Sequence, residues 1–372
     1  MLDTFTTYRL IARDVPKAIN RIEAQPMVKR ETEYFLANIG KVKSIDEFVK
    51  NDRLFKYAMK AFGLQDMDYA KAFMVKALKE GVADRDSFAN KLTDKRYAQF
   101  VSAFNFEALG AAATVHNPAQ HDVTTNYVIQ AEIAGVDPIG QFVTTETSYY
   151  LANIVNVKSV DDLMANERLY AYALAAYGLD FTTEDKDLIR EVLKGGVKDP
   201  ESAANKQENK ASAGLAAAFD FEGLGEAATT YTPAKQLTIE KYMRQTLEEN
   251  AGKTNEGVRL ALYFERKASS ITSWYDVLAD KALATVVRTA LGLPDSFASA
   301  DIDKQAALFE NRLDIADFTG PKLGKFLTRF TSLYEINHPT SSAATSVTVL
   351  FAQPTAIGIS TDLLFAMQKL KV

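Results

Sequence analysis

Residues 31–64, ETEYFLANIGKVKSIDEFVKNDRLFKYAMKAFGL, decide the fold because the chain repeats them. Residues 146–179, ETSYYLANIVNVKSVDDLMANERLYAYALAAYGL, match them at 19 of 34 positions without a gap. The same offset of 115 residues aligns further matches as far as residues 104–110 and 219–225. A unit of at least 84 residues is therefore duplicated, and a fixed period of this kind indicates an architecture of repeated modules.

A weaker third copy begins 229 residues after the first. Tyr263-Phe264 aligns there with Tyr34-Phe35, and the stretch ALGL that ends at Leu293 aligns with AFGL. We therefore predict three related helical modules in tandem, followed by a polar linker and a short, largely non-helical C-terminal tail. The predicted ranges are module 1 (1–114), module 2 (115–229), module 3 (230–337) and the tail (338–372).

The repeated stretch carries the signals of helix ends. Each copy places a serine three residues before an acid, which is the spacing of a capping box: Ser44, Ser159 and Ser273. Glu47 gives the strict form of the box, and the two aspartate copies give weaker forms. Each copy then caps a longer helix with Asn or Asp and ends it with a glycine suited to a left-handed cap: Asn51/Gly63, Asn166/Gly178 and Asp280/Gly292.

Further helices are expected in each module. In module 1 they run from Met67 to Lys79, from Asp84, and from Thr93-Asp94. The stretches 115–142 and 230–257 each predict a leading helix after an X-Pro break. In the tail, residues 347–360 suit a short extended pair and residues 361–371 a terminal helix. Strand-like alternation is nearly absent elsewhere, so the predicted fold class is all-α.

The composition excludes several classes of protein. With 47% hydrophobic and 24% charged residues, the 372-residue chain is typical of a globular protein of two or three domains. It has no cysteine, which excludes disulfides, thiolate nucleophiles and cysteine-ligated metals. A net charge of -5 gives no reason to expect nucleic acid. No stretch predicts membrane insertion or a Sec-type signal, so the cytoplasm is the expected location.

The motifs of common enzymes and cofactor sites fail on inspection. His116 and His121 stand five residues apart beside Asp122, which is not a helical ligand spacing, so we interpret them as part of a solvated loop. Gly223-Leu224-Gly225 matches the glycine-rich pattern of a dinucleotide-binding motif, but no predicted strand precedes it. The sequence therefore predicts no catalytic, cofactor-binding or metal-ligating residue. The sequence leaves open one kind of catalytic site, a pair of carboxylic acids that are distant in sequence, as in glycosidases.

Several polar residues are shared by modules 1 and 2 and lost in module 3, and six of them form the candidate site: Asn38, Lys43, Arg53, Asn153, Lys158 and Arg168. One interpretation is a duplicated recognition surface. We prefer the other, in which such residues cap helices and form hydrogen bonds within each module. The net charge is +1 for residues 31–114 (13 basic, 12 acidic) and -7 for residues 146–229 (8 basic, 15 acidic). This difference in net charge argues against a charged ligand that both modules bind.

The runs YFLANI, VKSIDEF, NDRL and AFGL together resemble a bacterial repeat family described as domain of unknown function 1217. Members occur in alphaproteobacteria, often among flagellar genes. The resemblance covers modules 1 and 2 and extends into module 3. It implies an association with flagellar assembly or motility through gene context, and it carries over no catalytic residue.

The expected function is a non-catalytic helical scaffold that is ancillary to flagellar assembly or motility. Its expected partners are proteins, flagellar components among them, with no nucleic acid and no membrane insertion. The first alternative is an exported, flagellum-associated structural component, since a flagellar export route needs no Sec signal. The second is an enzyme of unknown class. Long terminal heptads, typical of axial components, are absent. The sequence leaves the oligomeric state open.

Overall fold

The computed structural model describes residues 3–339, and every regular element within that range is a helix. The all-α fold class is therefore confirmed for the described part of the chain. No helix in this part is long and apolar enough to cross a membrane. The extended pair and the terminal helix expected in residues 347–371 lie outside the described residues.

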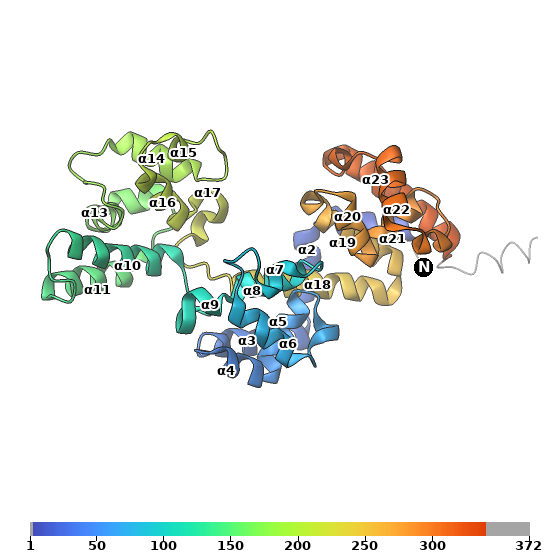
Figure 1. The fold of residues 1–372 in the computed structure, drawn as a ribbon, viewed down its shortest axis with the longest axis horizontal. Coiled ribbons are helices and arrows are strands. Elements are labelled where there is room, and N and C mark those ends of the chain that lie inside the picture. The colour runs from blue at the N-terminus through green and yellow to red at the C-terminus, as the bar shows by residue number, and fades with distance from the viewer. Residues whose placement is uncertain (1–2, 340–372) are drawn as a thin grey trace, which may run out of the picture. The chain divides into compact units, whose positions relative to one another are not determined.

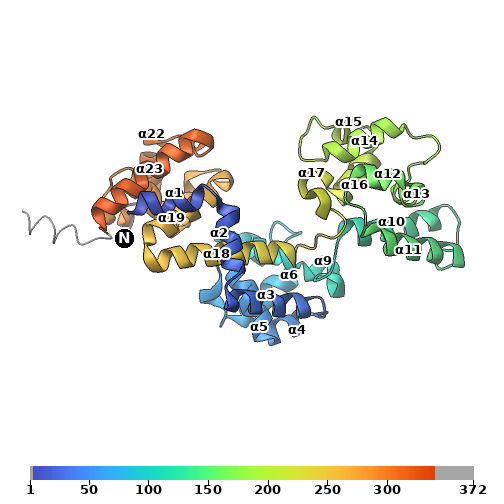
Figure 2. The same ribbon diagram turned by 180° about the vertical axis from the view of Figure 1, so that it is seen from behind.

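The helices belong to two compact units, whose elements are labelled in Figure 1 and Figure 2. Within the described residues, unit 1 consists of residues 3–18 and 247–339, and unit 2 consists of residues 19–246. Both boundaries fall inside helices, namely α2 (Val15–Glu23) and α18 (Gln236–Thr254). The N-terminal helix therefore belongs to the same unit as the last third of the chain.

The first half of unit 2 has an aromatic core. Phe48 and Phe104 are fully buried, with ring centroids 4.6 Å apart. Phe100 lies one turn before Phe104, so both rings leave the same helix face, with centroids 5.0 Å apart. The elements of this half are α3 (Pro26–Ile39), α4 (Ile45–Lys50), α5 (Asp52–Ala61), η1 (Gln65–Met67), α6 (Lys71–Glu80), α7 (Phe88–Lys91), α8 (Arg96–Phe104), α9 (Phe106–Leu109) and η2 (Gly110–Ala112).

The second half of unit 2 has its own core, in which Tyr150, Leu163 and Phe219 are fully buried. Its first helix, α10, packs against α11, α13 and α16. The elements are α10 (Pro118–Ile133), α11 (Gln141–Ile154), α12 (Val160–Ala165), α13 (Glu167–Ala175), α14 (Lys186–Gly195), α15 (Ala203–Lys206), α16 (Lys210–Phe219), α17 (Phe221–Leu224) and η3 (Gly225–Ala227).

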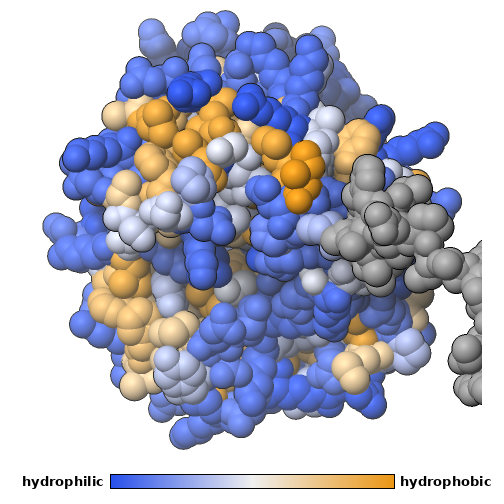
Figure 3. Space-filling model, turned by 90° about the vertical axis from the view of Figure 1, so that its right-hand side faces the viewer, coloured by the Kyte–Doolittle hydropathy of each residue, from blue (hydrophilic) through white to orange (hydrophobic). Residues whose placement is uncertain are grey.

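Unit 1 is built around helices from both ends of the described chain. Helix α1 packs against α19 and α23, and its Tyr8 joins a core that includes Phe264 and Phe330. The molecular face in Figure 3 is largely hydrophilic, with apolar residues gathered in patches. The elements are α1 (Thr4–Ala12), α19 (Glu256–Lys267), η4 (Ala268–Ser270), α20 (Trp274–Ala279), α21 (Lys281–Ala290), η5 (Asp295–Ser299), α22 (Ile302–Arg312), η6 (Ile315–Asp317) and α23 (Gly320–Asn337).

The predicted serine caps are present, but the strict capping box is not where we expected it. Ser44 Oγ accepts the amide of Glu47 at 3.2 Å, whereas the Glu47 carboxylate accepts from the amide of Lys43 rather than from that of Ser44. The reciprocal box forms at Ser273, whose amide donates to Asp276 at 2.9 Å. The shorter aspartate, which we ranked as a weaker form, therefore closes the box.

Other helix ends follow the local signals with small shifts. Gly63, Gly178 and Gly292 have φ of 70°, 70° and 69°, the conformation that their C-cap positions require. The helices expected from Met67, Asp84 and Thr93 begin later, at residues 71, 88 and 96. Side-chain turns account for the last two shifts, because Asp84 and Asp94 each accept the amide two residues ahead, at 2.8 and 3.0 Å.

Candidate functional site

Arg53 of the candidate set, in α5, is held by residues of α3, two helices earlier in the chain. Its Nε donates to Glu31 Oε2 at 2.8 Å, and a terminal nitrogen donates to Glu31 Oε1 at 3.1 Å. The guanidinium carbon lies 3.8 Å from the centre of the Tyr34 ring. This bidentate pair over an aromatic face ties α5 to α3.

Arg168 makes the corresponding contacts 115 residues later. It donates twice to Glu146, both times at 2.9 Å, and its guanidinium carbon lies 3.7 Å from the centre of the Tyr149 ring. The hydrogen bond from the arginine lowers the pKa of Glu146, and the same cause lowers the pKa of Glu31 in the first half of the unit. Both carboxylates therefore stay ionised and paired at neutral pH.

Asn38 and Asn153 bond to their own helices. Asn38 Nδ2 donates to the carbonyl of Tyr34 at 2.8 Å, and Asn153 Nδ2 donates to the carbonyl of Tyr149 at 2.8 Å. Each amide thus binds a carbonyl one turn earlier. Tyr34 is consequently a common partner of Asn38 and Arg53. Tyr149 is likewise a common partner of Asn153 and Arg168 in the second half of unit 2.

The two lysines of the candidate set lie at the surface. Lys158 Nζ is 3.8 Å from the carboxylate of Glu226, and the two side chains are 67% and 81% exposed. The Lys43 residue is exposed, and its backbone amide donates to Glu47 at 2.7 Å. An exposed ion pair of this kind contributes about 0–1 kcal/mol, so it does not fix a binding geometry.

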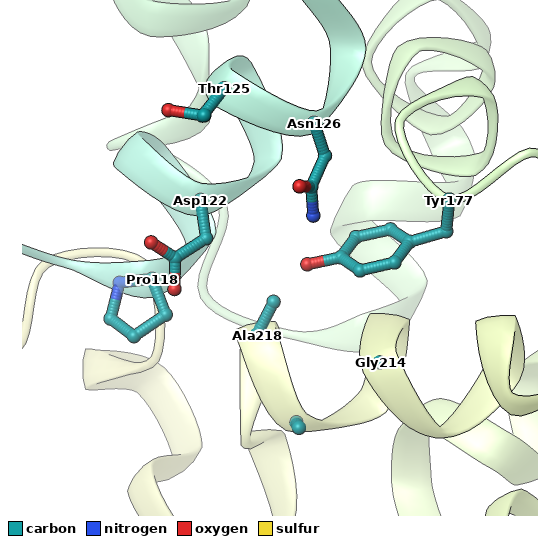
Figure 4. A pocket seen from close by; sticks show the side chains of 8 residues that line it. Pro118, Asp122, Thr125, Asn126, Tyr177, Gly214 and Ala218 are labelled. Carbon is teal, nitrogen blue, oxygen red and sulfur yellow. The ribbon is translucent and has the colours of Figure 1, made fainter. Parts of the chain in front are cut away.

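A pocket of about 430 Å³ opens between α10 and α16 (Figure 4). Its wall includes Asp122, Asn126 and Tyr177, and Figure 4 shows the Tyr177 hydroxyl turned toward Asn126. Burial, together with the charge of Asp122, raises the pKa of Tyr177 to about 12, although its hydrogen bond to Asn126 opposes the shift. Tyr177 is therefore protonated at neutral pH, and the pocket offers hydrogen bonds rather than a strong base.

The histidines of residues 116–121 do not form the solvated loop that we expected. His121 belongs to α10, and its Nδ1 accepts the amide of Asn117 at 3.1 Å. The His116 side chain is 15% exposed, with Nε2 2.7 Å from Asp122 Oδ1. The leading helix predicted for residues 115–142 begins before His121, because Asn117, followed by a proline, starts it and accepts the amide of Gln120. Among residues 3–339 no three acidic or histidine side chains gather as metal ligands.

The turn between α10 and α11 exposes apolar side chains that the sequence analysis did not single out. Ile133 is 73% exposed, Ile139 83% and Phe142 63%. We call these three residues the hairpin tip. A sequence signal was available, because apolar residues outnumber polar ones around the Gly-Val-Asp-Pro turn at residues 135–138. Ile133, Ile139 and Phe142 thus lie within ten residues of one another and are each more than half exposed.

Comparison with known proteins places the chain among relatives of unknown function. The crystal structure of protein AGR_C_984 from Agrobacterium tumefaciens is 35% identical in sequence, with a TM-score of 0.53, and the match covers 90% of this chain and 94% of that one. No curated protein matches the chain. The family described as "Protein of unknown function (DUF1217)" matches residues 61–172 and 176–323. The chain therefore belongs to the DUF1217 family.

Proposed function

We propose that this protein is a non-catalytic helical scaffold that binds a partner protein through the hairpin tip and acts in flagellar assembly or motility. The flagellar part of the proposal is supported by the gene context that the family resemblance implies. The binding part is supported by the geometry of the tip. Within the flagellar system the partner is a component of the apparatus or of its assembly machinery.

The exposure of Ile133, Ile139 and Phe142 is the observation that carries the proposal. Exposing three large apolar side chains within ten residues is unfavourable in water, and burying each contributes about 1.5–3 kcal/mol to a complex. Residues 115–157 contain acids but no lysine or arginine. The surface therefore suits a partner protein with an apolar centre and a basic rim.

We also propose that residues 1–114, 115–229 and 230–337 are three copies of one module. Contacts at the offset of 115 residues support it. Thr114 Oγ1 donates to the carbonyl of Val42 at 3.0 Å, and Thr229 Oγ1 donates to the carbonyl of Val157 at 2.9 Å. In each case a buried threonine near the end of the range binds the turn that leads into the second helix of the repeated stretch.

The test is a proximity-labelling and motility experiment in the bacterium that encodes the protein. The full chain replaces the native copy, either unchanged, as Ile139→Glu, or as Ile336→Glu. Ile336 is 73% exposed on α23 and serves as the matched control. We expect Ile139→Glu to lose labelled partners and swimming, and Ile336→Glu to keep both. Normal swimming and unchanged partners in the Ile139→Glu strain would refute the proposal. Finding the protein in purified flagella would instead support the alternative of an exported component.

A further inference from the structure

The pocket between α10 and α16 lies within unit 2 and is polar along one side. Of the eight residues that line it, Asp122 alone carries a charge, and α16 contributes the small residues Gly214, Ala217 and Ala218. Its volume of about 430 Å³ is within the range of pockets that hold small organic molecules. Recognition in this pocket therefore depends on α10 and on Tyr177, which follows the end of α13.

Asp122 brings a negative charge into the pocket. Its Oδ1 lies 2.7 Å from His116 Nε2, and its side chain is 49% exposed. The charge reaches the opposite wall, because it contributes to the raised pKa of Tyr177. A carboxylate beside a half-buried ring attracts a cation more strongly than one in open water does, since the local dielectric constant is lower. With Oδ1 at His116, Oδ2 is the oxygen that can accept from a ligand.

Asn126 and Tyr177 complete the polar side. The Asn126 side chain is hydrogen-bonded to the Tyr177 hydroxyl, and Figure 4 shows the amide nitrogen facing that hydroxyl. Because the nitrogen donates in this contact, the amide oxygen of Asn126 can accept a hydrogen bond from a ligand. The Tyr177 ring adds an aromatic face, which attracts cations. A carboxylate, an amide oxygen and a ring together suit a cationic donor.

Helix α10 and the first half of α18 cover corresponding helices in the two halves of unit 2. The Tyr127 ring stacks on Tyr172 of α13, with centroids 3.8 Å apart. Tyr242 stacks on Tyr57 of α5, again with centroids 3.8 Å apart. Tyr242 stands 115 positions after Tyr127, and Tyr57 stands 115 positions before Tyr172. The residues beside these two stacked pairs can therefore be compared position by position.

A lysine ammonium of the chain lies at the corresponding place in the first half of unit 2. Lys241 stands 115 positions after Asn126, and Phe62 stands 115 positions before Tyr177. Lys241 Nζ lies 5.2 Å from the centre of the Phe62 ring, and Phe62 is 5% exposed. In the second half a shorter asparagine replaces the lysine, and the tyrosine ring lines a pocket instead. The chain itself thus shows which chemical group fits over this ring.

Gly214 keeps the same ring accessible. It stands 115 positions after Gln99, so the second half has lost a side chain here as well. A Cβ on Gly214 would lie 3.0 Å from Cε1 of Tyr177, which is closer than an ordinary van der Waals contact. Any larger residue at position 214 would therefore press on the ring.

We infer that this pocket binds a primary alkylammonium group, with the ammonium over the Tyr177 ring and paired with Asp122. The first half of unit 2 supplies its own ammonium from Lys241 and has Leu237 at the position that corresponds to Asp122. The acid therefore occurs in the half where the cation comes from another molecule. An ammonium has three donors, and its alkyl chain packs against the small residues of α16. The inference does not depend on the partner proposed for the hairpin tip.

The ammonium group belongs either to a free amine or to a lysine side chain of another protein. The test titrates the full-length protein with n-butylamine and, separately, with Nα-acetyl-lysine methylamide, followed by NMR of carbon-13-labelled alanine methyl groups. The methyl signals of Ala217 and Ala218 are expected to shift and to saturate, since both residues line the pocket. Neutral n-butanol, of the same length, is expected to leave them in place. Binding of n-butylamine alone indicates a free amine, whereas binding of the lysine derivative indicates a lysine side chain.

Three variants test the assignment of the groups. Asp122→Asn should weaken amine binding about tenfold or more, because it removes a charge-assisted hydrogen bond. Glu132→Gln is the matched control, since it removes the same charge from an exposed position of α10 outside the lining and should leave binding unchanged. Asn126→Lys restores the arrangement of Lys241 and should abolish binding, because the new ammonium fills the pocket.

Circular dichroism establishes that each variant is folded. The inference is overturned if neither amine shifts the Ala217 and Ala218 signals of the unchanged protein, or if n-butanol shifts them equally. It is also overturned if Asp122→Asn or Asn126→Lys, when folded, binds the amines as the unchanged protein does.

Discussion

Truncating Tyr8 to alanine tests where α1 packs. Tyr8 is 6% exposed in the core of unit 1, so Tyr8→Ala removes a buried ring and leaves a cavity there. Large-to-small changes of this size cost about 3 kcal/mol. With a urea dependence of about 2 kcal/mol per molar for a unit of this size, the unfolding midpoint should fall by about 1.5 M.

Tryptophan fluorescence reports this unit alone. Trp274 is the chain's single tryptophan, is 7% exposed and belongs to the same core as Tyr8. Its rings face Phe309 and Phe318 at centroid distances of 5.8 and 5.7 Å, so its emission follows the opening of that core. We expect the fluorescence transition to shift to lower urea, while the part of the far-UV circular dichroism transition that arises from unit 2 stays in place.

Leu10 provides the control on the same helix, because it is 60% exposed. Leu10→Ala should move either transition by less than about 0.5 kcal/mol. If Tyr8→Ala left the Trp274 transition unchanged and shifted the transition of unit 2 instead, α1 would not pack against α19 and α23 as described.

Three further outcomes follow from buried groups. Tyr242→Ala should destabilise unit 2 by about 3 kcal/mol, seen by circular dichroism, and leave the tryptophan transition unchanged. Glu248 is 2% exposed and accepts two hydrogen bonds from Arg266, at 2.7 and 2.8 Å. Glu248→Ala should therefore lower the free energy of unfolding in urea by about 3 kcal/mol. Glu256→Ala, at an exposed ion pair, should lower it by less than about 1 kcal/mol. Burial raises the pKa of Tyr177 from 10.0 to about 12, so its stabilising effect is complete below pH 10 and is lost as the pH rises toward 12. Tyr177→Phe should flatten that loss in thermal melts across this range, and an unchanged pH profile would contradict the assignment.

The helix ends could be predicted from the sequence because their causes are local. Asn51, Asn166 and Asp280 each accept the amide of the leucine three residues ahead, at 3.2 Å in all three cases. A cap of this kind depends on four consecutive residues and needs no knowledge of the tertiary fold. The contacts of Arg53 and Arg168 were anticipated only as hydrogen bonds within a module, since sequence spacing does not identify Glu31 or Glu146 as the acceptor.

The partner of each leading helix could not be predicted for a physical reason. The spacing of Thr4, Tyr8 and Ile11 shows that α1 has a face to bury, but periodicity does not say against which helices. Many helices of the chain present an apolar face, so the pattern of one face does not identify the helix that covers it. The histidine prediction was wrong for a simpler reason, since His121 was placed in a loop although Asn117 caps α10 four residues before it.

The segment around Gly135 is where the sequence does distinguish a turn from a continued helix. Gly135 and Pro138 impose a turn because one adopts positive φ and the other cannot continue a helix. Asn250 and Lys253 impose neither, and helix propensity then favours continuing α18. Residues 135–138 and 250–253 therefore adopt different secondary structure, a turn and a helix, although the sequence pattern aligns them at an offset of 115 residues.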